Sequence, residues 1–248
     1  MRKQYFYAGV AFALLLLKLQ FLPAALLLAG ALTLLKRPAC AIGLGSGIAV
    51  LSLITALCLS PAVFMHWIAS LKLSDTIFSD PSYGYPVYLV SSLPAMIMHL
   101  FPMEMRNLVK LPCYLLSALI GLHALWFARA LFKANIIEVQ RVIPHVMLIA
   151  IFVLPLVLPH FLFYDLCVLS LASMIVFGTD WQDDLLQKQL QMLIVFVFAF
   201  VGVYMVFYMS PLHAWAQSIV LVSALCAAYV RVLFLLKPLA KPTATMIE

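Results

Sequence analysis

Long apolar runs, separated by short polar or basic connections, dominate the chain. A helix needs about 20 apolar residues to cross the ~30 Å hydrocarbon core of a bilayer. Six runs approach that length, and they cover Cys40–Leu59, Leu111–Phe132, Val142–Leu158, Leu162–Phe177, Leu190–Tyr208 and Ala214–Leu236. Together with the apolar region that precedes them, they predict an all-α, polytopic transmembrane bundle of about seven spans.

The first apolar region, Tyr5–Leu35, is too long for one untilted span, and Lys18, Gln20 and Pro23 interrupt it. Proline removes a backbone donor and loosens a helix. The pattern predicts either a single tilted and kinked helix or two half-helices that meet at a break.

A longer, more polar segment, Pro61–Lys110, separates the second and third spans. Its two amphipathic stretches, Phe64–Leu73 and Val87–Phe101, have the length and aromatic content of helices that lie in a membrane interface. The second stretch is also compatible with a re-entrant segment. The chain therefore divides into residues 1–60, the interfacial segment 61–110, the spans of 111–238 and a tail, 239–248.

Composition excludes an ordinary soluble domain. Of the 248 residues, 66% are hydrophobic and 10% are charged, whereas a soluble domain carries about 25% charged residues. The five cysteines form no C-x-x-C pair, and the histidines have no metal-ligand spacing, so we expect neither a metal site nor a cofactor. The net charge of +6 comes from scattered cations and predicts no nucleic-acid partner.

The distribution of Lys and Arg predicts the orientation of the chain in the membrane, because these residues are enriched in cytoplasmic loops. If Tyr5–Leu35 crosses once, one side of the membrane receives most of the basic residues, and this side is predicted to be cytoplasmic. The basic residues on this side are Lys36, Arg37, Arg129, Lys133, Arg141, Lys188, Arg231, Lys237 and Lys241. The 61–110 segment then lies outside the cytoplasm. The same count places Arg2 and Lys3 outside, which the rule disfavours. Either Tyr5–Leu35 is a re-entrant pair, or a further span normally precedes it.

Two groups of polar residues are candidates for chemistry, because ionisable residues within spans are costly to bury. In the first, Lys18 and Gln20 lie beside the expected helix break and are suited to bind a phosphate; the alternative is a lysine that snorkels to the interface. In the second, Asp165 follows His160 and Tyr164 at the external start of a span, where a carboxylate can orient a sugar hydroxyl. The alternative is an acidic residue favoured by the helix dipole.

The glycine-rich run Gly43-Leu44-Gly45-Ser46-Gly47 resembles a phosphate loop only superficially, since it lacks the G-K-[ST] ending. Small residues inside a span more often allow two helices to approach closely. We therefore expect this run to pack against another helix.

Two segments resemble bacterial polyprenyl-phosphate-mannose-dependent glycosyltransferases of family 87, which have the GT-C fold. One runs from Ala8-Gly9-Val10 through Lys18-Leu19-Gln20 to Lys36-Arg37, with Leu19 where the family has proline. The other is Phe163-Tyr164-Asp165-Leu166 followed by Val168-Leu169-Ser170-Leu171, which resembles the family's Tyr-Asp motif at the start of a late span. The resemblance covers roughly residues 5–178.

The resemblance implies a hexosyltransferase of cell-envelope glycan or glycolipid assembly, located in the bacterial inner membrane. Its partners would be a lipid-linked sugar donor, membrane lipids and a possible partner membrane subunit. Lys18 and Gln20 would engage the donor phosphate, while His160, Tyr164 and Asp165 would shape the sugar or acceptor pocket. The family's catalytic acid lies upstream of the Lys-x-Gln region and has no counterpart here, so the sequence predicts a partial or diverged enzyme. The alternatives are a membrane transporter or lipid flippase, or a non-catalytic subunit of a membrane complex.

Overall fold

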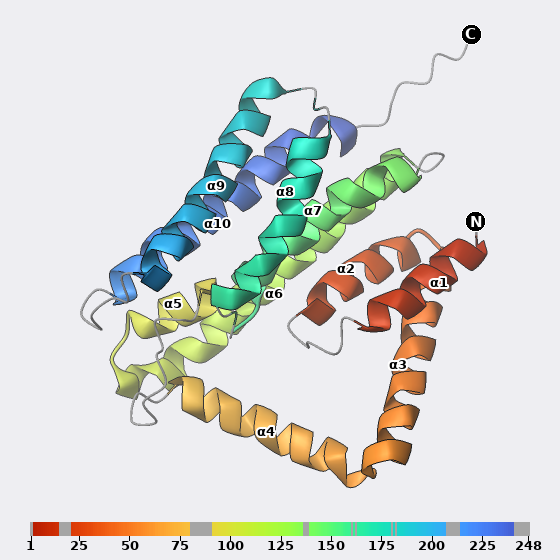
Figure 1. The fold of residues 1–248 in the computed structure, drawn as a ribbon, viewed down its shortest axis with the longest axis horizontal. Coiled ribbons are helices and arrows are strands. Elements are labelled where there is room, and N and C mark those ends of the chain that lie inside the picture. The colour runs from red at the N-terminus through yellow and green to blue at the C-terminus, as the bar shows by residue number, and fades with distance from the viewer. Residues whose placement is uncertain are drawn as a thin grey trace.

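The computed structural model describes residues 2–14, 21–79, 91–135, 139–159, 161, 163–179, 181, 183–206 and 214–240. All regular secondary structure in these residues is helical (Figure 1), as the sequence predicts. Four helical segments are long and apolar enough to cross a membrane: Ala39–Leu59, Glu104–Ala134, Asp184–Val203 and Ser218–Leu236. The other apolar helices are shorter, and the predicted count of seven spans is not confirmed.

Residues 2–59 form three helices. Helix α1 covers Arg2–Ala13, α2 covers Leu22–Thr33, and α3 covers Ala39–Leu59. Each of the first two has 12 residues, or about 18 Å at 1.5 Å per residue, which is shorter than a hydrocarbon core. A single continuous helix through Tyr5–Leu35 is therefore wrong, and the two half-helices are observed.

Helices α1 and α3 run in the same direction. Gly43 lies against the backbone of Phe6, and Gly47 lies against Val10 and Ala13, so positions advance together along both helices. Since α2 joins the end of α1 to the start of α3, it must turn back between them (Figure 1). The start of α1 therefore lies at the same end as the α2–α3 turn.

A corner at Ser60 joins α3 to helix α4, Ala62–Ser79. Ser60 has φ 80° and ψ 147°, a region of backbone space that is almost reserved for glycine. In Figure 1, α4 leaves the end of α3 and crosses the direction of the main bundle. The stretch Phe64–Leu73 is helical as predicted, and the helix is longer than that stretch.

Helices α5 and α6 follow the segment 80–90, which lies outside the described residues. Helix α5 covers Leu93–His99, within the predicted stretch Val87–Phe101. Helix α6 covers Met103–Ala134, 32 residues with Pro112 inside it. Its length of about 48 Å exceeds the hydrocarbon core, because the helix begins eight residues before the predicted span.

The rest of the chain completes the bundle. Helix α7 covers Val139–Val157, a 3-10 helix η5 covers Phe163–Val168, and α8 covers Leu169–Gly178. Helices α9 and α10 cover Asp184–Val206 and Ala214–Leu236, and a short 3-10 turn, η7, covers Pro238–Ala240. The predicted tail 239–248 lies outside the described residues from 241 onward.

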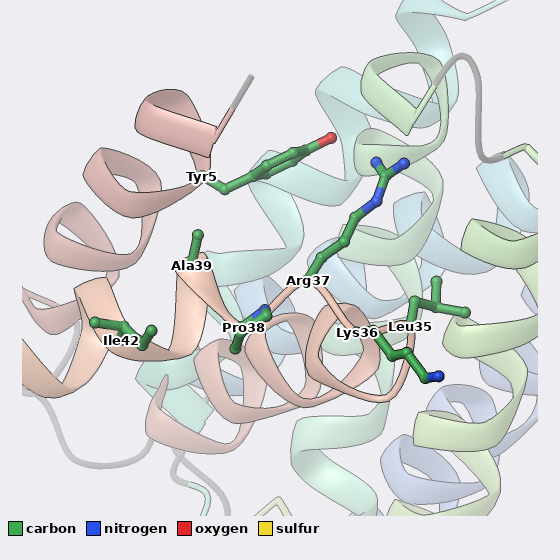
Figure 2. Close-up of a pocket in the computed structure, with 7 residues that line it drawn as sticks. All are labelled: Tyr5, Leu35, Lys36, Arg37, Pro38, Ala39 and Ile42. Carbon is green, nitrogen blue, oxygen red and sulfur yellow. The ribbon is translucent and has the colours of Figure 1, made fainter.

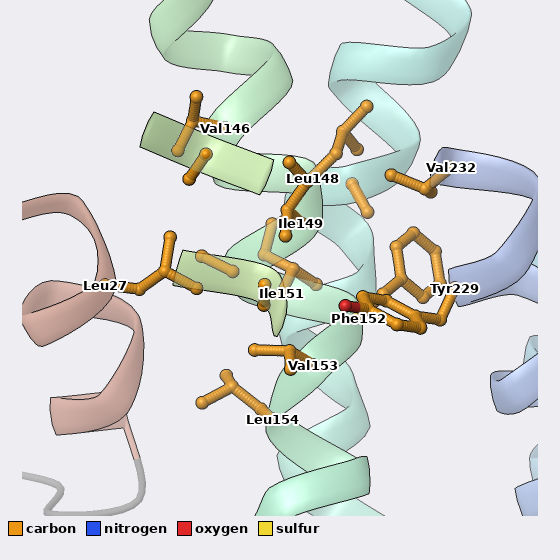
Figure 3. Packing of buried hydrophobic residues seen from close by; sticks show 14 of the residues in the cluster. Leu27, Val146, Leu148, Ile149, Ile151, Phe152, Val153, Leu154, Tyr229 and Val232 are labelled. Carbon is orange, nitrogen blue, oxygen red and sulfur yellow. The ribbon is translucent and has the colours of Figure 1, made fainter. Parts of the chain in front are cut away.

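Helix α7 forms the centre of the core. Every side chain from Leu148 to Leu154 is at most 3% exposed. Figure 3 shows these side chains between Leu27 of α2 on one side and Tyr229 and Val232 of α10 on the other. The bundle is thus organised around one helix that is enclosed by its neighbours.

Contacts between helix ends define two ends of the bundle. At the first, Asn135 donates a hydrogen bond from Nδ2 to the Leu239 carbonyl (2.9 Å), and Arg231 Nε donates to Gln189 Oε1 (3.0 Å). At the second, the Ser92 hydroxyl donates to the Pro159 carbonyl (3.0 Å). We call these the basic end and the opposite end, because the first carries most of the cations.

Candidate functional site

The opposite end of the bundle contains a small buried polar junction. Here α5 meets α7 and the residues that lead from α7 into η5. Asp165, Ser91 and Ser92 are at most 2% exposed. Such burial of a carboxylate is costly in apolar surroundings, where charged groups persist only with compensating interactions. This junction is the strongest candidate site among the sequence-predicted residues.

Local sequence explains how α5 reaches this junction. Ser92 is the N-cap of α5 and accepts a hydrogen bond from the Ala95 N–H (3.4 Å), while Pro94 occupies the first turn. A serine at the N-cap accepts a hydrogen bond from an N–H group that has no partner within the helix, and a proline in the first turn has no N–H group that needs one. The same Ser92 hydroxyl donates to Pro159, so one residue both starts α5 and attaches it to α7.

A second contact ties α5 to the segment before η5. The Ser91 backbone N–H donates to the Phe161 carbonyl (2.6 Å), and the Phe161 side chain is fully buried. Phe161 lies four residues before Asp165. The two serines therefore hold the backbone at Pro159 and Phe161, shortly before Asp165. Their role could not be read from the sequence, because Ser91-Ser92-Leu93-Pro94 signals only a helix start.

Asp165 itself lies in the 3-10 helix η5, which continues into α8. The sequence predicted a span from Leu162 with the aspartate one turn inside it. The helix does begin there, but with a tight 3-10 turn, and the carboxylate is fully buried. It is thus not the solvent-facing acid that a helix dipole alone would favour at an exposed helix start.

The remaining sequence-predicted site residues are not placed. Lys18, Gln20 and His160 lie outside the described residues. Tyr164 lies within η5, but its side chain is not described. The structure therefore does not test whether Lys18 and Gln20 approach the buried aspartate.

The basic end has a different character, since its polar groups mostly hold helices together. The Trp181 indole donates to the Val176 carbonyl (3.2 Å), and the His145 ring packs edge-on against it with centroids 4.9 Å apart. Lys188 pairs with Asp184 one turn earlier in α9 (3.1 Å), an exposed ion pair of small energetic value. The contacts of Trp181 join α7 to α8, whereas the ion pair lies within α9.

A cleft at the basic end stands apart from these structural contacts. It has a volume of about 650 Å³ and is lined by Tyr5, Leu35, Lys36, Arg37, Pro38, Ala39 and Ile42. Figure 2 shows the Arg37 guanidinium and the Tyr5 hydroxyl facing the same space, with the Lys36 ammonium pointing away from them. From the sequence, Lys36 and Arg37 were interpreted only as markers of the cytoplasmic side.

Fold and junction together define an all-α protein with helices suited to a membrane and a buried carboxylate at one end. No family model, curated protein or solved structure matches this chain.

Proposed function

We propose that the chain is a multi-pass membrane protein whose basic end faces the cytoplasm. The support is the distribution of cations: Lys36, Arg37, Lys133, Arg231 and Lys237 belong to this end. Lys3 joins them, because α1 begins beside the start of α3. The placement of α1 therefore removes the conflict with the positive-inside rule. With α3, α6, α9 and α10, helices α7 and α8 would make six spans, α7 as an enclosed inner helix. The α1–α2 pair would enter and leave the membrane on the basic side.

We further propose that this protein acts on a polyprenyl-phosphate-linked sugar in cell-envelope assembly, as a GT-C-like glycosyltransferase that is partial or diverged. One observation carries this proposal, the full burial of Asp165 at the external end of the bundle. An ionisable group kept at this depth indicates function by default. It also lies where the sequence resembles the Tyr-Asp motif of the family 87 enzymes.

In this proposal Asp165 accepts hydrogen bonds from sugar hydroxyls, as a carboxylate is suited to do. Lys18 and Gln20 engage the phosphate of the donor lipid, and His160 and Tyr164 complete the pocket. Transfer also needs a base within hydrogen-bond reach of the acceptor. Glu104, at the start of α6, is exposed, and an exposed acid is poorly held for that role. We therefore expect substrate binding without turnover unless a partner supplies the base.

A second proposal, a non-catalytic subunit of a membrane complex, is favoured by α4. Its main packing partner among the described helices is α3, and Met65, Trp67, Ile68 and Leu73 are exposed along it. A helix that projects from the bundle in this way is available to a partner subunit as well as to the membrane interface.

The test is binding of polyprenyl-phosphate-mannose to the purified chain in liposomes, with Asp165→Asn as the variant. We expect at least about a tenfold loss of affinity, because a charge-assisted hydrogen bond is replaced by a neutral one. Asp183→Asn is the matched control, since Asp183 is exposed at the basic end, and its affinity should not change. Equal binding by both variants would refute the role of Asp165.

Sugar transfer is measured in the same liposomes with a set of acceptors. Robust transfer by the chain alone, abolished by Asp165→Asn, would contradict the expected dependence on a partner. Absence of binding by the wild-type chain would instead favour the subunit proposal.

A further inference from the structure

We propose that the cleft between α1 and the α2–α3 turn binds the phosphate of an anionic membrane lipid at the basic end. This site is separate from the proposed sugar site, which lies at the opposite end of the bundle. The inference goes beyond the proposed glycosyltransferase function and shares with it only the membrane orientation. We call the cleft, defined by Tyr5, Leu35, Lys36, Arg37, Pro38, Ala39 and Ile42, the Arg37 cleft.

The first support is the state of the Arg37 guanidinium. Arg37 is half-buried, and it faces the cleft together with the Tyr5 hydroxyl (Figure 2). Within the described part of the chain, no hydrogen bond or ion pair engages either side chain. A guanidinium presents a planar fork of donors that matches a phosphate in two parallel hydrogen bonds. A half-buried guanidinium beside a hydroxyl therefore forms a donor set to which an anion is complementary.

The second support is the backbone that presents Arg37. The α2 helix ends in a pair of hydrogen bonds, from Arg37 N to the Leu32 carbonyl (3.0 Å) and from Lys36 N to the Thr33 carbonyl (2.9 Å). This is the Schellman arrangement, in which glycine normally takes the left-handed position. Here Lys36 takes it, with φ 60°. The turn thus holds two consecutive cations in a fixed conformation between two helices.

The third support is the start of α3. Its first turn, Ala39 to Ala41, contributes N–H groups without partners in the helix, and Pro38 and Ala39 line the cleft. The positive end of the helix dipole adds to the potential of Arg37 and favours an anion there. Since α1 runs parallel to α3, Tyr5 of α1 closes the other side of this first turn.

The walls of the cleft identify a lipid, as opposed to free phosphate. Leu35 and Ile42 are apolar, and Ile42 is 57% exposed. Exposed apolar residues follow farther along α3: Val50 lies eight residues, or about two turns, after Ile42, and Leu53 and Leu57 follow at three- and four-residue spacing. A phosphate at Arg37 therefore places the acyl chains on a continuous apolar face that the protein leaves uncovered. A volume of about 650 Å³ lies within the usual range of ligand pockets.

The experiment measures lipid binding by native mass spectrometry of the full chain released from detergent. The probes are phosphatidylglycerol and phosphatidylcholine with identical acyl chains. We expect the wild type to bind phosphatidylglycerol more tightly. Arg37→Gln should weaken phosphatidylglycerol binding by about tenfold and leave phosphatidylcholine binding unchanged. Lys133→Gln is the matched control, because Lys133 is an exposed cation at the same end, and its binding should stay within about twofold of wild type.

Two further measurements keep the test decisive. Tyr5→Phe removes only a hydroxyl, so if Arg37→Gln does not fold, a several-fold loss in Tyr5→Phe still supports the site. Millimolar inorganic phosphate is added to the wild-type complex, and we expect it not to displace the lipid. Displacement by phosphate would overturn the choice of a lipid. Equal lipid binding by the wild type, Arg37→Gln and Tyr5→Phe would overturn the site itself. These outcomes are independent of polyprenyl-phosphate-mannose binding at Asp165.

Discussion

Helices α7 and α3 both consist mostly of apolar residues, yet α7 lies inside the bundle and α3 at its edge. Helix α7 is enclosed, and its side chains from Leu148 to Leu154 are all buried. Helix α3 fully buries only Cys40, Gly43, Leu44 and Gly47, and large apolar side chains such as Leu53 and Leu57 are exposed along it. In water the exposed face of α3 would be strongly disfavoured. In a bilayer it is not, because lipid tails are as apolar as leucine side chains.

The two helices are therefore held by different means. Large side chains interdigitate around α7 and fill the space between it and its neighbours (Figure 3). The contact of α3 with α1 instead depends on glycine, because Gly9, Gly43 and Gly47 have no side chain and let the two backbones approach closely. In lipid, where no hydrophobic drive distinguishes helix from tail, such close packing is what holds helices together.

We expect the largest loss of stability from Gly43→Ala, a substitution at the contact between α3 and α1. A methyl group at Gly43 would overlap the Phe6 carbonyl oxygen, a backbone atom that cannot rotate away. We expect a loss of at least about 3 kcal/mol in unfolding free energy, because one helix must move as a whole. Gly45→Ala is the matched control two residues away, where nothing lies within 4 Å. Equal unfolding free energies of the two variants, measured by SDS titration in bicelles, would refute the α1–α3 contact.

A smaller effect is expected from Leu154→Ala in α7. Its side chain is 1% exposed, so truncation leaves a cavity. We expect the unfolding free energy to fall by about 2 kcal/mol, near the lower limit for a buried leucine. The loss is small because a leucine side chain that leaves the core enters lipid, which is as apolar as the core itself. Leu53→Ala in α3, where the side chain is 60% exposed, should change stability by less than about 0.5 kcal/mol. The same SDS titration compares them, and a larger loss for Leu53→Ala would reverse the assignment of inner and outer helix.

The smallest effect concerns the corner at the end of α3. Ser60 adopts a backbone conformation that glycine tolerates without strain. Ser60→Gly should therefore stabilise the chain by about 1 kcal/mol. Ser52→Gly, inside the same helix, should destabilise it by about 0.5 kcal/mol through lower helix propensity. A melting temperature that falls in both variants would show that the corner is not strained.

Much of this fold follows from the sequence, because spans are recognised by length and apolarity alone. The predicted spans Cys40–Leu59 and Ala214–Leu236 match α3 and α10 within one residue. The interruption around Lys18 and Pro23 correctly indicated a break, and α2 has Pro23 in its first turn. The glycine run at Gly43–Gly47 was correctly assigned to helix packing, since both terminal glycines contact α1.

Other features depend on how the helices pack against one another, and the apolar pattern of one sequence does not show this. Val142–Leu158 and Cys40–Leu59 are both apolar enough to be predicted as spans, and apolarity alone does not separate an enclosed helix from a peripheral one. The parallel arrangement of α1 and α3 brings Tyr5 next to Arg37, 32 positions later, and no local pattern signals that pairing. Ser91 and Ser92 likewise gain their role only through contacts with Phe161 and Pro159.

The most direct test of the account is the side of the membrane on which α1 begins. Single cysteines are introduced at Lys3, Ser60 and Lys237 in a chain whose five native cysteines are replaced, and intact cells are treated with an impermeant thiol reagent. The account predicts labelling of Ser60→Cys in intact cells, and labelling of Lys3→Cys and Lys237→Cys only after permeabilisation. Labelling of Lys3→Cys together with Ser60→Cys in intact cells would contradict the α1–α2 hairpin and the shared basic end.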